Sequence, residues 1–433
     1  MHDLHLTWSW VGIASLAIFV IGYYFIAAEE KYEINKAKPA LFIGTFMFTL
    51  IGIYFAVNGL DTQHLHDELK ILILEIAEIF FFLFVAMTFI ETMIERNVFD
   101  VLKYKLVSKG YSYKQLFWYT GFIAFFLSPV ADNLTTALIL STVLFTIDKT
   151  NKEFLVPGAI NIVVAANAGG AWSPFGDITT LMAWTAGKGA FVDFMALFPA
   201  SVVGWVITGW LLARVVPEGK PPFSEQTDKI ELLKPGAKVV IWLGVATIAM
   251  AVLGHQFFHF PAMWGMMTGL AVLKLYSYRL KRVENEHFDV FVNMKHVEND
   301  TLLFFFGILS AVGALHFLGF LEYVVKLYDV IGATAGNIGV GFISAIVDNV
   351  PVMSAVLKAN PEMGLDQWLL VTLTAGIGGS MISFGSAAGV GVMGRLRGIY
   401  TFGSHMRHAW TIVVGYIVSM VVWYVQFEVL GLY

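Results

Sequence analysis

Long apolar stretches constrain the fold of this chain more than any other feature of its sequence. A bilayer core of about 30 Å needs about 20 apolar residues in a helix. Runs of that kind lie near 8–28, 38–57, 71–94, 191–213, 261–277, 302–320 and 409–430, and the shorter stretch 239–255 also fits. With 58% hydrophobic and 14% charged residues, the composition is typical of a membrane protein with many spans.

Charge and cysteine content exclude several classes of protein. The formal net charge is −5, and the basic residues form no dense stripe, so no nucleic-acid partner is expected. The sequence contains no cysteine, which excludes disulfides, thiolate metal sites and redox chemistry through sulfur. Membrane lipid is the expected environment, and no cofactor is predicted.

Four apolar segments do not fit one uninterrupted span each. We interpret two of them as re-entrant hairpins: 115–147, interrupted by Ser128-Pro129, and 335–357, interrupted by Asp348-Asn349-Val350-Pro351. We interpret the over-long, glycine-broken segments 154–186 and 368–394 as single spans that are unwound in the middle. Lipid cannot satisfy free backbone amides, so such breaks must be shielded by protein or line a wet cavity. They therefore indicate the functional region.

Counting each hairpin as a return to the same face gives ten full spans. Basic residues test this arrangement, because short cytoplasmic loops carry an excess of lysine and arginine. With the N-terminus outside, all but four of the 27 basic residues fall on the inner face, the exceptions being Lys70, Lys188, Lys326 and Lys358. We therefore expect a multi-pass protein of the bacterial cytoplasmic (inner) membrane, with both termini outside.

The spans divide into two halves of five. Residues 217–238 are rich in proline and mixed charge, and we interpret them as a cytoplasmic linker. The predicted first repeat is 1–216, with the hairpin 115–147, and the second is 239–433, with the hairpin 335–357.

Two motifs recur in the same order in both halves. Ser128-Pro-Val-Ala-Asp132-Asn133 returns 216 residues later as Ser344-Ala-Ile-Val-Asp348-Asn349, and Gly169-Gly170 with Phe175-Gly176-Asp177 returns as Gly378-Gly379 with Phe384-Gly385-Ser386. Because five is odd, the second repeat starts on the opposite face. The fold expected is an all-α polytopic membrane protein, an inverted repeat of five spans each, with two re-entrant helical hairpins and two unwound transmembrane helices. Transporters of this kind hold their substrate between broken helices near the bilayer midplane.

Two of these strings are long and specific: Ser128-Pro-Val-Ala-Asp-Asn-Leu-Thr-Thr136, and Asn167-Ala-Gly-Gly-Ala-Trp-Ser-Pro-Phe-Gly-Asp177 followed by Thr179 and Thr180. With the Asp348-Asn349 hairpin, they make the whole chain resemble the NhaD-type sodium/proton antiporters of the ion transporter superfamily. The resemblance implies export of cytoplasmic Na⁺, or Li⁺, in exchange for external H⁺ by alternating access. Asp177 stands where the second half has Ser386, so the two halves are not expected to bind ions equally.

The chemistry of the breaks suits a sodium ion, which prefers oxygen ligands. A carboxylate buried in low dielectric also has a raised pKa, so it can hold a proton and release it when a cation approaches. We expect Asp132, Asn133, Asp348 and Asn349 to bind Na⁺. The further candidates for ion or proton binding are Ser128, Thr135, Asn167, Asp177, Thr179, Thr180, Ser344, Ser383, Ser386 and Glu78.

Each of these candidates has a structural alternative. The hairpin aspartates and asparagines are also favoured at helix N-caps, as are Asp177, Thr179 and Thr180 after a helix break. Asn167 is either a ligand or part of an interhelical hydrogen bond. Glu78 is expected near the midplane as a proton carrier, with an internal salt bridge as the alternative. The edge histidines His255, His259, His405 and His408 are candidates for a pH sensor or for interfacial packing.

Three other functions remain open at this point. A sodium-coupled anion or dicarboxylate symporter uses the same architecture, although acids at both tips disfavour an anionic substrate. An intramembrane aspartyl protease needs two apposed aspartates that share a proton, and a purely structural protein gains nothing from buried acids. Partnership with a second copy of the chain, as a homodimer, is also open.

Overall fold

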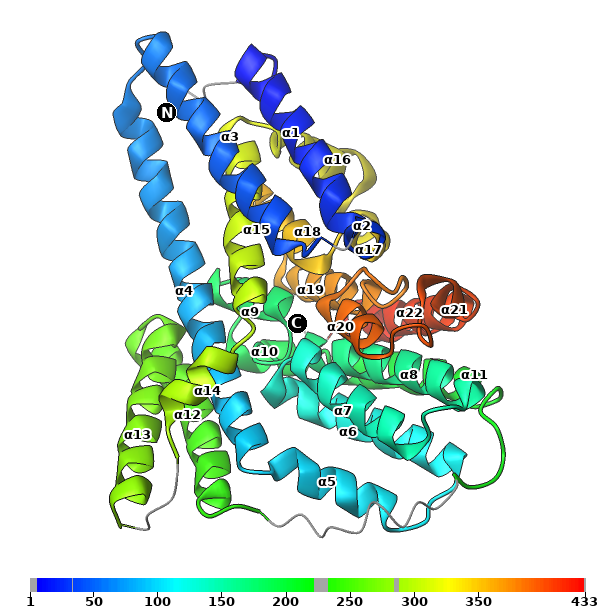
Figure 1. Ribbon diagram of the computed structural model, residues 1–433. Coiled ribbons are helices and arrows are strands. Elements are labelled where there is room, and N and C mark those ends of the chain that lie inside the picture. Colours follow the sequence, from blue (N-terminus) through cyan, green and yellow to red (C-terminus); the bar gives the residue numbers. More distant parts are fainter. Residues whose placement is uncertain (1–5, 33, 222–232, 284–287, 432–433) are drawn as a thin grey trace.

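The computed structural model describes residues 6–32, 34–221, 233–283 and 288–431, and these ranges contain helices, turns and short loops (Figure 1). Eight of the described helical segments are long and apolar enough to cross a membrane. This confirms an all-α, polytopic membrane protein. Residues 222–232, in the middle of the predicted linker 217–238, lie outside the described residues.

Two of the N-terminal helices, α1 (Trp10–Ala27) and α4 (Thr62–Glu95), begin at polar caps. The Ser9 side chain accepts the N–H of Gly12, and the Asp61 side chain accepts the N–H of Gln63, so each satisfies an otherwise free donor of the first turn. The elements are α1 (Trp10–Ala27), α2 (Glu29–Tyr32), α3 (Ala37–Val57), α4 (Thr62–Glu95) and α5 (Val98–Val107). α4 has 34 residues, roughly 51 Å at 1.5 Å per residue, and so extends well beyond the predicted span 71–94.

In the rest of the first half, breaks divide the apolar segments 115–147 and 154–186 into two helices each. A capping box between Ser112 and Gln115 starts the first of these helices. The elements of this part are α6 (Tyr113–Ala131), α7 (Asn133–Ile147), α8 (Lys152–Ala171), α9 (Ile178–Thr185), α10 (Phe191–Met195) and α11 (Phe198–Leu212).

The second half has five described helices before its hairpin, of which the first four are α12 (Ala237–Phe258), α13 (Ala262–Val283), α14 (Val290–His296) and α15 (Asn299–Phe317). The following elements are α16 (Glu322–Ile331), α17 (Ala333–Ile346), α18 (Asn349–Ala359), α19 (Leu365–Gly378), α20 (Ala387–Arg395), α21 (Phe402–Met406) and α22 (Ala409–Tyr424), which continues as the π-helical turn Val425–Val429.

The helices pack as two groups, which Figure 1 shows at different inclinations. In the first group, α3 packs on α1 and α15, and α4 packs on α13 and α15. In the second group, α6, α7, α11 and α19 surround α8, and α17 packs on α19. Every residue of α8 from Phe154 to Ala171 is buried, so α8 is the centre of that group. α18 contacts α15 and connects the two groups.

The number of long apolar helices is lower than the ten spans expected. Among the described residues, α13 is long enough but not apolar enough to count as a span, and the segment 368–394 is divided into α19 and α20. The predicted breaks at 154–186 and 368–394 are present. In 115–147, α6 continues through Ser128-Pro129, where an interruption was expected, and ends at Ala131, so the break lies at Asp132, which was expected at the hairpin tip.

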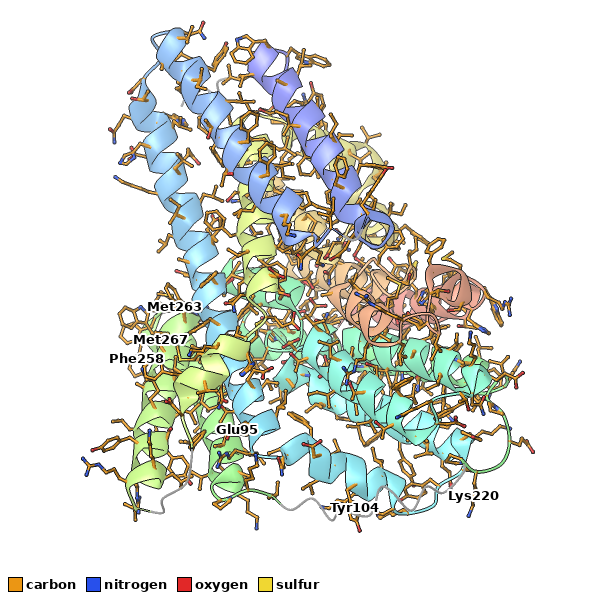
Figure 2. All side chains as sticks on the ribbon, viewed as in Figure 1. Glu95, Tyr104, Lys220, Phe258, Met263 and Met267 are labelled. Atoms are coloured by element: carbon orange, nitrogen blue, oxygen red, sulfur yellow. The ribbon has the colours of Figure 1, made fainter. Side chains whose placement is uncertain are left out.

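The outer surface is apolar where the helices face away from the core. Phe258, at the end of α12, is 66% exposed, and Met267 on α13 is also exposed; Figure 2 shows both at the periphery. In water such a surface would be costly, whereas lipid tails solvate it. Polar side chains such as Tyr104 and Lys220 lie at the lower end of the view in Figure 2.

Candidate ion-binding site

The first hairpin turns at Asp132, between α6 and α7. Its backbone has φ 55° and ψ 162°, a conformation that side chains rarely adopt. The Asp132 carboxylate caps α7, because Oδ1 accepts the N–H and Oδ2 accepts the hydroxyl of Thr135, both at 2.8 Å. At the open end, Tyr113 Oη donates to Asp148 Oδ2 at 2.7 Å. The start of α6 and the end of α7 therefore lie together, as a hairpin requires.

The second hairpin turns at Val347 and Asp348, between α17 and α18. Asp348 Oδ1 accepts the N–H of Val350 at 3.4 Å, so this aspartate also caps the second arm of its hairpin. Asn349, like Asn133 in the first hairpin, is the first helical residue after the turn. Both asparagines are buried.

A serine in each first arm ties its hairpin to a broken helix. Ser128 Oγ donates to the carbonyl oxygen of Ala166 in α8 at 2.6 Å. Ser344 Oγ donates to the carbonyl oxygen of Ala375 in α19 at 2.8 Å. These two predicted site residues therefore position the hairpins rather than point into a shared centre.

Two glycines bring the hairpins and the broken helices into backbone contact. A Cβ added to Gly169 would lie 2.3 Å from the carbonyl oxygen of Phe125, which loses its helical partner because Pro129 has no N–H. A Cβ added to Gly378 would likewise lie 2.3 Å from the carbonyl oxygen of Gly341. Only glycine fits at these contacts without moving backbone.

The second half of each broken helix begins at a predicted site residue. Asp177 Oδ1 accepts the N–H of Thr179 at 3.1 Å and caps α9. Ser386 Oγ accepts the N–H of Gly389 at 3.3 Å and caps α20. The Thr180 hydroxyl donates to carbonyl oxygens at the end of α8, which the break leaves without helical partners.

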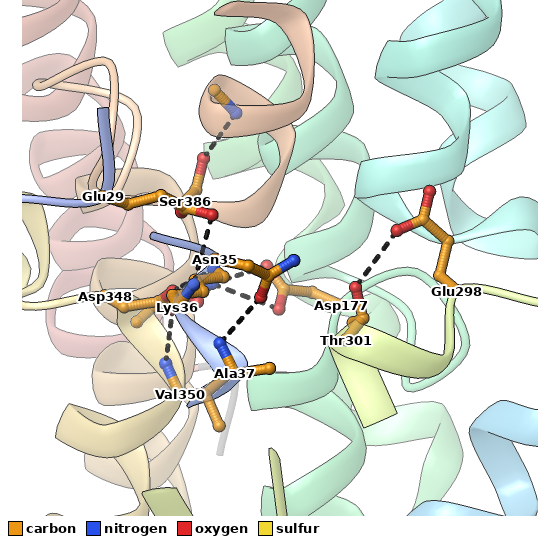
Figure 3. A network of polar contacts seen from close by, with 12 residues as sticks. Glu29, Asn35, Lys36, Ala37, Asp177, Glu298, Thr301, Asp348, Val350 and Ser386 are labelled. Carbon is orange, nitrogen blue, oxygen red and sulfur yellow. Dashed lines mark hydrogen bonds and ion pairs between the residues drawn. The ribbon is translucent and has the colours of Figure 1, made fainter. Parts of the chain in front are cut away.

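The two hairpin tips meet at Asp177. Asn133 Nδ2 donates to Asp177 Oδ2 at 3.1 Å, and Asn349 Nδ2 donates to Oδ1 and Oδ2 at 3.3 and 3.2 Å. The side chain therefore receives one amide from each half of the chain, and Asp177 is only 3% exposed. Figure 3 shows it at the centre of the polar network.

Asn167 extends this network into the second half. Its Oδ1 accepts from Asn133 Nδ2 at 3.0 Å, and its Nδ2 donates to the hydroxyls of Ser380 and Ser386 at 2.8 and 2.9 Å. Asn167 therefore makes the interhelical hydrogen bonds expected as one alternative, and these lie beside the candidate ligands. Ser380 was not predicted, although it directly follows the Gly378-Gly379 pair.

The centre is asymmetric between the halves. Asn167 precedes Gly169 by two residues, and the matching residue before Gly378 is Gly376. A Cβ added to Gly376 would lie 3.5 Å from Asp177 Oδ2. The second half therefore leaves room beside the Asp177 carboxylate, where the first half fills the matching position with an amide.

The other predicted residues lie around this centre or away from it. Asp132 and Thr135 bond to each other at their own tip. Ser383 is fully buried, and its hydroxyl has no hydrogen-bond partner among the described residues, so its oxygen is free for a ligand. Glu78 is half-buried on α4 and lines a separate cavity of about 490 Å³ that also contains Glu68 and Glu75.

The charged partner of Asp348 was missed by the sequence analysis. Lys36 Nζ lies 3.0 Å from Asp348 Oδ2, and it also lies 4.3 Å from the ring centroid of Phe304. In the sequence, Lys36 is one of several basic residues of an inner loop, and no motif distinguishes it. Lys36 and Asp348 line a cavity of about 900 Å³ together with Glu29 and Arg397.

One of the edge histidines is buried. His405, on the short helix α21, is fully buried; its ring lies between the Tyr400 hydroxyl at 2.7 Å and the carbonyl oxygen of Met381 at 3.1 Å. Burial lowers the pKa of His405 to about 4. Because it stays neutral at neutral pH, packing rather than pH sensing describes this residue.

Membrane-crossing helices, two hairpins that meet two broken helices, and polar side chains buried at that meeting point define a secondary transporter. A family model described as a citrate transporter, CitMHS, matches residues 23–378. The Na⁺/H⁺ antiporter NhaD of Vibrio cholerae serotype O1 is 44% identical, over 96% of this chain and 92% of that protein. The chain belongs to the NhaD family of Na⁺/H⁺ antiporters.

Two further relatives extend the comparison. The Na⁺/H⁺ antiporter NhaD of Alkalimonas amylolytica is 43% identical, over 97% of this chain and 91% of that protein. Sodium/proton antiporter 1 of Arabidopsis thaliana is 30% identical, over 89% of this chain and 68% of that protein. These relatives are transporters, not enzymes, so the protease alternative has no support among them.

Proposed function

We propose that this chain exports cytoplasmic Na⁺ in exchange for external H⁺. Relatives whose names describe Na⁺/H⁺ antiport support this, as does the resemblance of its motifs. The observation that carries the proposal is the buried carboxylate of Asp177, which faces one asparagine from each hairpin. Ionisable groups buried in a membrane protein are costly and mark ion pathways.

The same side chains can serve the empty and the occupied site. In the structure the amide nitrogens of Asn133 and Asn349 donate to Asp177. An amide carries its oxygen and nitrogen on one carbon, so a half-turn about the last side-chain bond exchanges donor for acceptor. Na⁺ bound at Asp177 would then find amide oxygens beside the carboxylate. The second broken helix adds the Ser383 hydroxyl, which has no partner among the described residues, and the space at Gly376 beside Asp177.

The architecture proposed for exchange is the inverted repeat of 1–216 and 239–433. The order of elements supports it, because each hairpin follows a ten-residue helix, α5 or α16, and precedes a broken helix. The cavity at Asp348 contains Lys36 and Arg397, which the basic-residue distribution places inside. The cavity at Glu78 contains Lys188 and Lys358, which it places outside. The site would thus be reached from opposite faces, in alternation.

Exchange follows if one site accepts either ion but not both. A proton on a carboxylate removes both its charge and one of its oxygen ligands, so it competes with Na⁺. We propose this competition for Asp177 and for the hairpin residues Asp132 and Asp348. Li⁺, which has the same charge and also prefers oxygen ligands, would be expected to compete in the same way.

The test compares two aspartate-to-asparagine variants in everted membrane vesicles. A proton gradient quenches a pH dye, and addition of Na⁺ should restore its fluorescence in the wild-type protein. Asp177→Asn keeps the shape but removes the charge, so Na⁺-dependent recovery should fall at least tenfold at equal amounts of membrane protein. Asp67→Asn makes the same change at an exposed site on α4 and should leave recovery unchanged. Full recovery in Asp177→Asn would refute the proposed site.

The symporter of anions is the second candidate, since the matching family model is described as a citrate transporter. The chemistry of the site disfavours it, because the buried carboxylates of Asp177 and Asp348 would repel a carboxylate substrate. Uptake of labelled citrate driven by Na⁺, with no pH response to Na⁺ alone, would favour the symporter.

A further inference from the structure

Lys36 stands on a segment that is fixed on both sides. Its backbone N–H donates to Glu29 Oε1 at 3.2 Å. The neighbouring Asn35 accepts the N–H of Ala37 at 2.9 Å and donates to Asp300 Oδ2 at 2.7 Å. This ties the start of α3 to the start of α15, so the position of the lysine backbone is well defined.

The Lys36 side chain reaches from this segment to the tip of the second hairpin. The ammonium lies 3.0 Å from Asp348 Oδ2, with the lysine side chain 14% and the aspartate side chain 7% exposed. Asn349, the next residue, donates to the Asp177 carboxylate. Figure 3 shows Lys36, Asp348 and Asp177 in one connected group. The ammonium of Lys36 therefore pairs with the hairpin carboxylate that adjoins the candidate ion site.

We propose that Lys36 is a tethered cation that occupies the Asp348 carboxylate when Na⁺ is absent and is displaced when Na⁺ binds. The inference rests on the proposed antiport and adds a specificity-determining residue to it. A buried carboxylate left without a counter-charge is strongly unfavourable. Lys36 supplies that charge in the ion-free carrier, and Na⁺ supplies it in the loaded one.

The surroundings allow the ammonium to leave and return. Lysine is a compact point charge on a flexible four-carbon chain, unlike the planar fork of arginine. The cavity of about 900 Å³ begins at Asp348 and contains the Glu29 side chain. A displaced ammonium can thus move into the cavity and stay near a carboxylate, while the backbone of Lys36 remains in place.

Competition of this kind has a measurable consequence, because a tethered competitor weakens the apparent affinity for Na⁺. If the paired state is favoured about tenfold, the wild-type protein needs about ten times more Na⁺ for half-saturation than a variant without the charge. A lysine that only holds the loop in place would give the opposite result. Its loss would lower the maximal rate or the amount of folded protein without improving the affinity.

The experiment measures Na⁺-dependent exchange at one fixed pH in proteoliposomes. Lys36→Gln should lower the half-saturating Na⁺ concentration about tenfold. Lys36→Arg keeps a positive charge and should stay within a few-fold of wild type. Lys38→Gln removes an exposed charge from the same first turn of α3 and should not change the constant. An unchanged or raised Na⁺ constant in Lys36→Gln overturns the proposal.

A binding assay keeps the proposal testable if a variant binds without transporting. Stabilisation of the purified protein by Na⁺ in detergent gives a binding midpoint, and Lys36→Gln should shift it to about tenfold lower Na⁺. In the Asp348→Asn background the same change should have no effect, because no carboxylate remains to compete for. An equal shift in both backgrounds would overturn the pairing. If wild-type protein binds Na⁺ with the expected Lys36 dependence but does not exchange it, only the antiport proposal fails.

Discussion

Asp132 and Asp348 occupy the same place in their hairpins but have different partners. Asp348 pairs with Lys36, whereas both oxygens of Asp132 bond to Thr135. The Asp132 backbone has φ 55°, which costs on the order of 1–3 kcal/mol, and its cap helps to hold that turn. The structure shows the capping role of Asp132, and variants can separate it from the proposed role in ion binding.

Asparagine caps a helix about as well as aspartate but carries no charge. Alanine has no charge and also cannot cap the helix. We expect Asp132→Asn to abolish Na⁺-dependent exchange while the unfolding temperature stays near that of wild type. Asp132→Ala should also lose about 0.5–2 kcal/mol of stability. Exchange in vesicles and thermal unfolding in detergent measure the two effects. Near-normal exchange in Asp132→Asn would leave Asp132 with the capping role alone.

Individual residues were predictable where a repeated motif carried them. Asn133, Asn349 and Asp177 follow from the two matched strings, and the structure brings these three together. Lys36 did not follow, because its partner is 312 residues away and a single lysine in a basic loop has no pattern. Long-range charge pairing of this kind depends on tertiary packing.

At the scale of elements, glycine contacts determine how closely a hairpin approaches its broken helix. A Cβ at Gly378, on α19, would overlap the carbonyl of Gly341 on the hairpin arm α17. A Cβ at Gly339, on the same arm as Gly341, meets nothing within 4 Å. We expect Gly378→Ala to destabilise by about 1–3 kcal/mol through overpacking and to impair exchange. Gly339→Ala, the matched control, should be neutral or stabilising by up to about 1 kcal/mol. Thermal unfolding compares them, and equal effects would contradict this view of the contact.

The elements themselves were largely predictable, but their ends were not. Polar residues and proline inside apolar runs indicated both hairpins, and glycines inside over-long apolar runs indicated both broken helices. The helix continues through Ser128-Pro129, where an interruption was expected, and the turn lies at Asp132, the residue expected at the hairpin tip. Ser173 Oγ donates to the Pro129 carbonyl oxygen, and Gly169 packs beside the Phe125 carbonyl that Pro129 leaves free. The helices α5 and α16 were not predicted, since ten residues of mixed polarity give no membrane signal.

At the scale of the molecule, hydropathy alone does not count the spans. α13 is long enough but not apolar enough, and α19 and α20 are each too short, to count as single apolar spans. Protein rather than lipid covers the central helix of the second group, α8, which is buried from Phe154 to Ala171. Burial inside a helical group allows breaks and polar residues that lipid would not tolerate. The arrangement in two groups could not be derived from sequence, because it depends on packing between distant helices.

The whole carrier should show competition between Na⁺ and protons. If both occupy the same buried carboxylates, lowering the pH should raise the half-saturating Na⁺ concentration and leave the rate at saturating Na⁺ far less affected. Where protons occupy the site, the apparent affinity should fall by up to about tenfold per pH unit for each proton displaced. A separate pH sensor would instead change the maximal rate, and His405 is an unsuitable sensor because burial lowers its pKa to about 4. Exchange measured over a grid of Na⁺ concentrations and pH distinguishes the two, since a constant half-saturating concentration with a collapsing maximal rate would exclude competition.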